Sequence, residues 1–206
     1  MRGTMMSKVV KDCRGCCTEL YTIGYQPLGC GFRCGQYKPF HTADQARSQS
    51  TEGVPIDVFL LSDKYPLNIR WWVDVTPFDR WHDPDNLHIG EHTNHIVAII
   101  SSAPFQQVMT VVKRGWKLFL RDGSADSFWN GLFFDPYGMC RSVAFARIIH
   151  FCLEKTGFKS VPVMHLSREW WTYGDCGGAC DECRLDRMSE NKTAALQRAY
   201  DMWLEC

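Results

Sequence analysis

Short apolar runs, each about the length of one β-strand, constrain the fold of this chain more than any other feature. These runs cover 56–62, 69–75, 95–101, 107–113, 116–122 and 131–136. The pairs Arg114-Gly115 and Asp122-Gly123 supply turn formers between neighbouring runs. Short apolar runs bounded by turn formers are typical of strands. The spacing therefore predicts a central, mainly antiparallel sheet.

A helical period appears twice in the second half of the chain. In 139–155 the apolar side chains share one face, a set made of Phe145, Ile148, Ile149, Cys152 and Leu153. The stretch 159–166 returns to strand character, and Pro162 indicates an edge strand. The segment 189–206 predicts a final helix capped by Ser189, with an inward face of Leu196, Tyr200, Trp203 and Leu204. Strands combined with flanking helices in this order predict an α+β fold.

The 206 residues divide into two regions of different composition. Residues 1–40 are rich in cysteine and glycine, and we expect them to form a cysteine-rich N-terminal region. A polar stretch at 41–53 is typical of an exposed loop or linker. We expect 54–206 to form the main α+β domain, because that part carries the apolar runs and the helical periods.

Charge and hydropathy exclude several classes of protein. The 23 basic and 23 acidic residues cancel, so the charge does not indicate a nucleic-acid partner. No stretch approaches the roughly 20 apolar residues that a membrane span needs, and the first residues lack the apolar segment of a signal peptide. We therefore expect an intracellular protein that is not secreted. Its 11 cysteines are then thiols, metal ligands or nucleophiles rather than disulfides.

Four cysteines near the N-terminus have a spacing that suits a metal. Cys13, Cys16, Cys30 and Cys34 follow the pattern C-x2-C-x13-C-x3-C. Four thiolates brought together by two turns can complete a tetrahedral zinc site. These four residues are the predicted ligands of a structural Zn²⁺, and free buried thiols are the alternative.

A second cysteine group lies near the C-terminus and allows several interpretations. Cys176, Cys180 and Cys183 follow the pattern C-x3-C-x2-C. That spacing is the one that binds a [4Fe–4S] cluster in radical-SAM enzymes. The same three thiolates could hold zinc together with His165 or with a cysteine of the N-terminal region.

Three residues could instead form a hydrolytic site. His95 opens an apolar run, where a histidine can act as a base near neutral pH. Asp135 ends another run before a proline, and a carboxylate there can orient a histidine. Cys176 is followed by two glycines that allow backbone N–H groups to approach a bound carbonyl. The structural alternatives are a hydrogen-bonded histidine and an Asp-Pro turn without chemistry.

The order His95, Asp135, Cys176 resembles that of the adenain-like cysteine endopeptidases, viral maturation proteases related to the SUMO-specific proteases. The matching pieces are HIVAII, FFDPYG, the expected helix and strand that follow, and DCGGAC, and they span 90–183. By this resemblance Cys176 is the nucleophile, His95 the general base and Asp135 its orienting acid. The resemblance also implies cleavage of a protein or peptide substrate through a thioester, in the cytoplasm or nucleus of a host cell.

The sequence thus leaves two functions open. The first is a thiol endopeptidase or isopeptidase that works through Cys176, His95 and Asp135. The second is a non-catalytic, zinc-stabilised binding module, or an iron–sulfur protein, in which Cys176 is a metal ligand. The two functions make opposite demands on one sulfur atom, because a ligand sulfur cannot also be a free nucleophile.

Overall fold

A computed structural model describes part of the chain in enough detail to define the fold. The described residues are 19–24, 40–42, 71–81, 88–122, 129–135, 138–158, 161, 163–166, 168, 176, 179–184 and 188–206. The predicted zinc ligands Cys13, Cys16, Cys30 and Cys34 lie outside these residues, and so does the predicted strand 56–62.

The described strands form one sheet, and most of its neighbours are parallel. The strands are β1 (Leu20–Gly24), β2 (Phe40–Thr42), β3 (Trp71–Asp74), β4 (Gly131–Asp135) and β5 (Val163–His165). Their order across the sheet is β2-β3-β4-β1-β5. β4 pairs in parallel with β3 and with β1, β1 pairs in parallel with β5, and β2 pairs antiparallel with β3. The prediction of a mainly antiparallel sheet is therefore wrong.

The error has a definite source in the helices. They are α4 (Thr93–Ser101), α5 (Phe105–Asp122), α6 (Arg141–Lys155) and α7 (Glu190–Glu205). The runs 95–101, 107–113 and 116–122, predicted as strands, belong to α4 and α5. A short apolar run does not by itself distinguish a buried strand from a buried helix. Gly115, interpreted as a turn, lies inside α5 at a position where an added Cβ would meet nothing closer than 3.8 Å.

Helices between sequential strands explain why the strands run parallel. α4 and α5 connect β3 to its parallel neighbour β4, and α6 connects β4 to β5 on the far side of β1. Such crossovers return the chain to the same end of the sheet, so that each new strand runs in the same direction as the one before. The fold is consequently of the α/β type and not the predicted α+β type.

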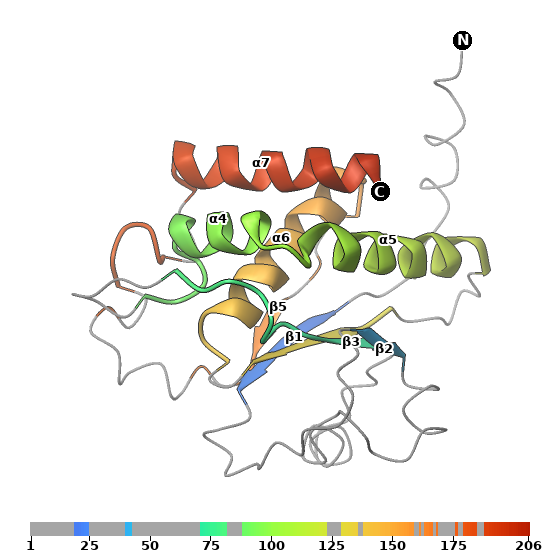
Figure 1. The fold of residues 1–206 in the computed structure, drawn as a ribbon, viewed down its shortest axis with the longest axis horizontal. Helices are drawn as coiled ribbons and strands as arrows, with labels where there is room; N and C mark the ends of the chain where they lie inside the picture. The colour runs from blue at the N-terminus through green and yellow to red at the C-terminus, as the bar shows by residue number, and fades with distance from the viewer. Residues whose placement is uncertain are drawn as a thin grey trace.

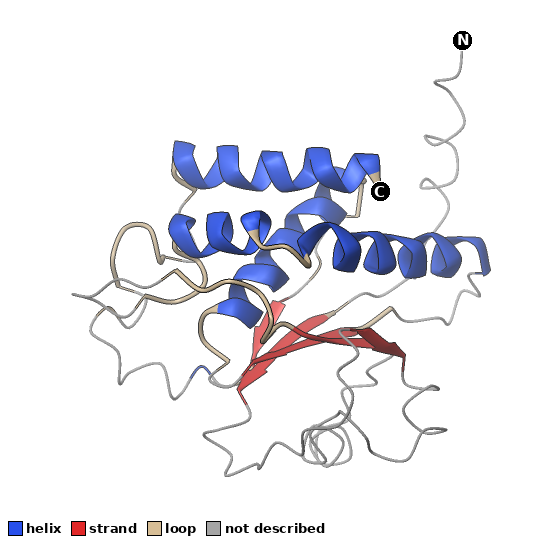
Figure 2. Cartoon of the chain, in the orientation of Figure 1, coloured by secondary structure: helices blue, strands red, loops and turns tan. Residues whose placement is uncertain are grey.

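All four described helices gather on one side of the sheet (Figures 1 and 2). α6 lies against β1, β4 and β5, and α7 covers the face of α6 that points away from the sheet (Figure 1). The predicted apolar face of α6 is confirmed, because Phe145, Ile148, Ile149, Cys152 and Leu153 are all fully buried. On α7, Leu196 and Trp203 are buried as predicted, but Leu204 is 57% exposed.

The predicted ends of several elements are also confirmed. Ser189 caps α7, because its side chain accepts a hydrogen bond from the Lys192 backbone N–H. β5 lies at the sheet edge among the described strands, although it is shorter than the predicted 159–166. No single described helix combines the length and the apolarity to cross a membrane; α4 and α5 meet both criteria only as a pair, and the chain bends by 91° between them.

The parallel strands place their carboxyl ends along one edge of the sheet, which we call the carboxyl edge. β3 ends there at Asp74, β4 at Asp135 and β5 at His165. α6 begins beside this edge, immediately after β4. In open α/β sheets, ligands bind outside the carboxyl ends of the strands. The carboxyl edge is therefore the expected place for a site.

Candidate metal centre

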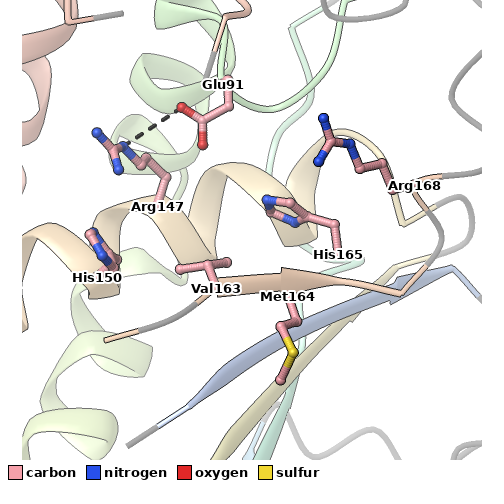
Figure 3. A pocket seen from close by; sticks show the side chains of 7 residues that line it. All are labelled: Glu91, Arg147, His150, Val163, Met164, His165 and Arg168. Carbon is pink, nitrogen blue, oxygen red and sulfur yellow. Dashed lines mark ion pairs between the residues drawn. The ribbon is translucent and has the colours of Figure 1, made fainter. Parts of the chain in front are cut away.

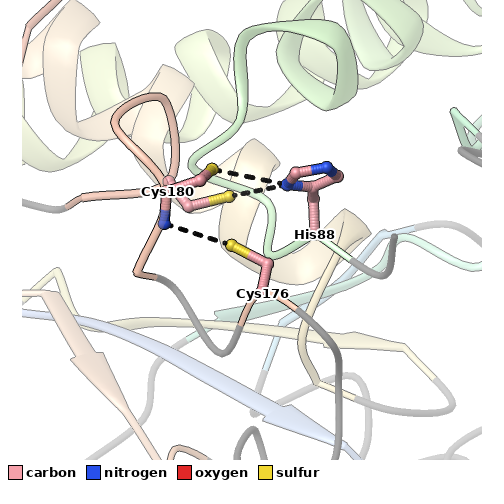
Figure 4. Close-up of side chains that lie close together, drawn as sticks. His88, Cys176 and Cys180 are labelled. Carbon is pink, nitrogen blue, oxygen red and sulfur yellow. Dashed lines mark hydrogen bonds between the residues drawn. The ribbon is translucent and has the colours of Figure 1, made fainter. Parts of the chain in front are cut away.

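Four potential metal ligands come together near the first turn of α6. They are His88, Cys176, Cys180 and Cys183, and one ligand atom from each lies within 4.8 Å of all the others. His88 Nδ1 is 3.5 Å from Cys180 Sγ and 3.4 Å from Cys183 Sγ. Figure 4 shows the labelled His88 ring facing the cysteine side chains. We call these four residues the Cys3His group.

The three cysteines are held by a compact turn of the backbone. The Cys180 backbone N–H donates to Cys176 Sγ at 3.4 Å. The backbone N–H groups of Cys183 and Arg184 both donate to the Cys180 carbonyl, at 3.0 and 3.2 Å. Backbone donors to a ligand sulfur stabilise its thiolate form and orient it. The C-x3-C-x2-C spacing thus folds into a turn that directs three sulfur atoms to one point.

His88 reaches this point because its segment packs on the start of α6. The Gly90 backbone N–H donates to the Met139 carbonyl at 2.8 Å. A Cβ built on Gly90 would lie 2.1 Å from the Cys140 carbonyl oxygen, so only glycine permits this approach. Cys140 Sγ donates to the His88 carbonyl oxygen at 3.3 Å and fixes the backbone of the ligand itself.

Cys183 and Cys140 are both buried thiols at this site, and they have different roles. Cys183 is fully buried, and burial together with the neighbouring Cys180 raises the pKa of its thiol. Burial, aided by the charge of Asp135, raises the pKa of the Cys140 thiol to about 12, so Cys140 stays protonated and acts as a donor. A bound divalent cation favours the thiolate form that burial disfavours.

The turn is also joined to the beginning of α4. Thr93, the first residue of α4, donates its hydroxyl hydrogen bond to the Glu182 carboxylate. This hydrogen bond is the main reason that the pKa of Glu182 is lowered. A carboxylate near the N-terminus of a helix is favoured by the helix dipole. The cysteine turn is therefore attached both to the segment before α4 and to the helix itself.

Aromatic stacking surrounds the histidine side of the group. The Trp81 ring stacks on His92 with centroids 4.7 Å apart and lies 5.4 Å from the centroids of both His88 and His95. His95 is buried in the first turn of α4, not at the start of a strand as predicted. Burial, followed by the charge of Arg80, lowers the pKa of His95 to about 4. Its imidazole is therefore neutral at physiological pH.

The predicted catalytic residues have different neighbours. Cys176 joins the Cys3His group, whereas the His95 ring faces the Trp81 edge. Asp135 does end a buried strand as predicted. Its carboxylate accepts the backbone N–H groups of Gly138, at 2.5 Å, and Ser142, at 2.8 Å. These contacts fix the loop from β4 into α6, where Gly138 has a φ of 64°.

The arrangement of the Cys3His group fits a tetrahedral zinc ion. Sulfur atoms about 2.3 Å from a tetrahedral zinc are roughly 3.8 Å apart. The four ligand atoms already lie within 4.8 Å of one another, so closing around an ion needs movements of about 1 Å or less. Three thiolates and one imidazole are a ligand set that selects zinc over hard cations such as magnesium.

Comparison with known proteins adds no further constraint. No known protein family, curated protein or solved structure matches this chain. The resemblance to adenain-like endopeptidases therefore stays a prediction that these comparisons do not test.

Sequence reasoning found three of the four grouped residues and missed His88. The fourth ligand was expected to be His165 or an N-terminal cysteine. His165 instead lies on β5, where its Nδ1 is 2.9 Å from Thr22 Oγ1. The signal for His88 is the sequence HIG at 88–90, in which a glycine two residues on lets the histidine segment approach a helix closely.

Proposed function

We propose that this chain is a zinc-stabilised binding protein in which His88, Cys176, Cys180 and Cys183 hold one structural Zn²⁺. The single observation that supports the proposal most is the convergence of these four ligand atoms within 4.8 Å. A site with four protein ligands is closed, because it leaves no position for a reactive water. The role of the metal is then mechanical: it joins the turn at 180–183 to the segment that enters α4.

Geometry favours a single ion over an iron–sulfur cluster. In a [4Fe–4S] cluster each thiolate binds a different iron, so the ligand sulfurs surround the whole cluster and lie farther apart. Sulfur and nitrogen atoms that already approach within 4.8 Å leave room for one ion at their centre. The imidazole of His88 as fourth ligand also fits the common Cys3His zinc site.

The endopeptidase hypothesis differs from this proposal at Cys176. As a nucleophile, Cys176 must be a free thiolate activated by an imidazole. As a zinc ligand, it is shielded until the metal leaves. The neutral, buried His95 and the backbone contacts of Asp135 both agree with structural roles. We therefore assign Cys176 to the metal.

Metal analysis of the full chain tests this assignment. We expect the double variant Cys180→Ser/Cys183→Ser to contain about one zinc ion per chain fewer than the wild type, because two ligands cannot retain the ion. Cys206→Ser is the matched control, since Cys206 is a half-buried thiol at the end of α7, and it should leave the zinc content unchanged. Because only the difference in zinc content between variant and wild type is used, zinc bound elsewhere on the chain does not affect the result. Equal zinc contents in the double variant and the wild type would contradict the proposal.

Alkylation rates then separate the two roles of Cys176. If zinc holds the sulfur, iodoacetamide should modify Cys176 slowly in the purified protein and much faster after a chelator is added. If Cys176 is a nucleophile, it should react fastest before chelation, and His95→Ala should slow it. Mass spectrometry of the peptide that contains Cys176 gives the rate directly, with Cys206 as the internal reference thiol.

A further inference from the structure

A cavity of about 430 Å³ opens between α6 and the edge strand β5. Its size is within the range of sites for small molecules. The polar side chains that line it are Glu91, Arg147, His150, His165 and Arg168. Figure 3 shows them arranged around a common space, with Val163 and His165 on β5 and His150 and Arg147 on α6. We call it the Arg147 cavity.

Positive charge exceeds negative charge in the wall of this cavity. Glu91 is the one carboxylate among the described lining residues, and it is almost fully buried. Arg147 Nε lies 3.6 Å from Glu91 Oε2, and the buried Lys192 Nζ lies 3.8 Å from the same oxygen. Arg168 adds a further positive charge at the mouth. Arg147 and Lys192 therefore share one carboxylate, and with Arg168 they leave an excess of positive charge that a bound anion would reduce.

The Arg147 guanidinium has donors that the protein uses poorly. Its Nε is buried and, among the described residues, has no hydrogen-bond partner, because the ion pair to Glu91 is too long for one. One of its Nη groups donates to the Met188 sulfur at 2.9 Å. A thioether is a weak acceptor, whereas a guanidinium carries five donors suited to an oxyanion. The side chain is thus held in place without a strong acceptor.

Two neutral histidines also lie in the wall of the cavity. Burial, followed by the charge of Arg168, lowers the pKa of His165 to about 4, and burial also lowers the pKa of His150. Each ring is therefore uncharged at physiological pH, and the single N–H of His150 donates to the Val161 backbone. His165 Nδ1 is 2.9 Å from Thr22 Oγ1, which fixes the orientation of its ring. Uncharged rings at these positions do not add to the repulsion between the arginines.

We propose that the Arg147 cavity binds a small molecule through an oxyanion, a phosphate or a carboxylate, held by Arg147 and Arg168. The inference rests on the proposed binding role of the chain, but it does not depend on which metal the Cys3His group holds. The volume exceeds that of an inorganic phosphate, so the natural ligand carries a further part beyond its anionic group. His150 and His165 then lie beside the group that the arginines hold.

The test uses the full chain, with its zinc content measured on the same sample. Inorganic phosphate and malonate are titrated separately at constant ionic strength, and backbone amide shifts are followed by NMR. We expect saturable shifts on α6 and β5 for at least one of the two anions. Saturation by phosphate alone identifies a phosphate site, and saturation by malonate identifies a carboxylate site.

Substitutions test whether the two arginines bind the anion. Arg168→Gln should weaken binding about tenfold or more, because it removes a charged hydrogen-bond donor. Arg147→Lys keeps the charge beside Glu91 and tests the planar donor geometry, and it should also weaken binding. Arg114→Gln is the matched control, since Arg114 is an exposed arginine on α5. It removes the same charge and should leave the affinity unchanged.

Two results would overturn the inference. One is the absence of saturation by both anions, and the other is an equal loss of affinity in Arg168→Gln and Arg114→Gln. Failure of the zinc proposal would look different, because it would appear in the metal analysis and not in the anion titrations. A chain without zinc that still binds phosphate at Arg147 would contradict the metal assignment alone.

Discussion

The apolar core between the helices and the sheet and the Cys3His group at the carboxyl edge are two regions stabilised in different ways. The core joins α4, α5, α6, α7 and the strands through many fully buried side chains. Around the cysteines, the part of the chain that the structure describes forms a small separate buried cluster, a set made of Ile89, Met139, Cys140, Val143 and Cys183. Removing apolar surface from water stabilises the first region in proportion to its area, and the second has little such area.

This difference indicates which part of the fold the proposed metal would stabilise. The turn at 180–183 belongs to this smaller cluster and not to the main core, and among the described residues few apolar side chains pack on it. Four ligands around one ion can hold such a turn without a large buried surface. The core should therefore stay folded when the metal is removed, whereas the segments around His88 and Cys183 should loosen. Substitutions placed in each region can test this separation.

The largest effect is expected from a substitution in the core. Phe145 on α6 is fully buried, and its ring lies near those of Phe78, Phe105 and Phe133, with centroids 5.1 to 6.3 Å apart. Phe145→Ala should lower the free energy of unfolding by about 3–5 kcal/mol, through lost burial and a cavity. Urea denaturation measures this loss, and Leu204→Ala, at an exposed position of α7, should change it little. A loss of zinc from folded Phe145→Ala would show that the two regions are not independent.

An intermediate effect is expected where the two regions meet. Gly90→Ala places a Cβ against the Cys140 carbonyl and the Ala144 backbone nitrogen, at 2.1 and 2.4 Å, so the segment that carries His88 must move. We expect a loss of about 2–3 kcal/mol in the free energy of unfolding and a weaker hold on zinc. Competition with a chromogenic chelator measures the zinc affinity.

The matched control for this substitution is Gly115→Ala. Gly115 lies inside α5, where the added methyl group has space. Alanine favours a helix over glycine by about 1 kcal/mol, so this variant should be slightly more stable with an unchanged zinc affinity. An equal zinc affinity in Gly90→Ala and the wild type would mean that the position of His88 does not depend on the close approach at Gly90.

The parts of the fold that sequence predicted correctly are those with an unambiguous period. For α6 the helical period is clear, because the apolar residues Phe145, Ile148, Ile149, Cys152 and Leu153 recur at a helical spacing and all are buried. β4 was also predicted, since GLFFD is short, apolar and followed by a proline. The apolar run of α4 is too short to distinguish a helix from a strand, and in α5 the pair Arg114-Gly115 divides one helix into two runs of strand length. These two ambiguities turn two helices into three predicted strands and a parallel sheet into an antiparallel one.

The site was predictable only in part for a related reason. Cys176, Cys180 and Cys183 are close in sequence, so their spacing alone indicates a common ligand turn. His88 lies far from them in sequence and becomes a neighbour only after α4 and α6 have packed. The cavity lined by Arg147 and His165 has the same origin, because it joins a helix and an edge strand. No local pattern marks such pairs.

The smallest effect is expected from a decrease in pH, which affects the stability of the core and the binding of the proposed metal at the same time. His165 has a pKa lowered from 6.5 to about 4 by burial and then by Arg168. The unfolded chain therefore takes up a proton on this ring below pH 6.5, while the folded protein does not do so until about pH 4. Stability from this group is complete above pH 6.5 and falls as the pH decreases through that window.

Replacing His165 separates its contribution to the pH dependence of stability from the contribution of the metal. Between pH 7 and 5.5 the wild type should lose about 1 kcal/mol more of its free energy of unfolding than His165→Asn does. Urea denaturation at each pH gives the two losses, and zinc content measured in parallel shows where acid releases the ion. Above pH 7 the two proteins should show the same pH dependence, which serves as the internal control.

If His165→Asn loses as much stability as the wild type, then His165 is protonated in the folded protein and its ring is not shielded from water. A neutral His165 beside Arg147 and Arg168 is also what the proposed anion site requires, so this measurement bears on the cavity as well as on the comparison of the two regions.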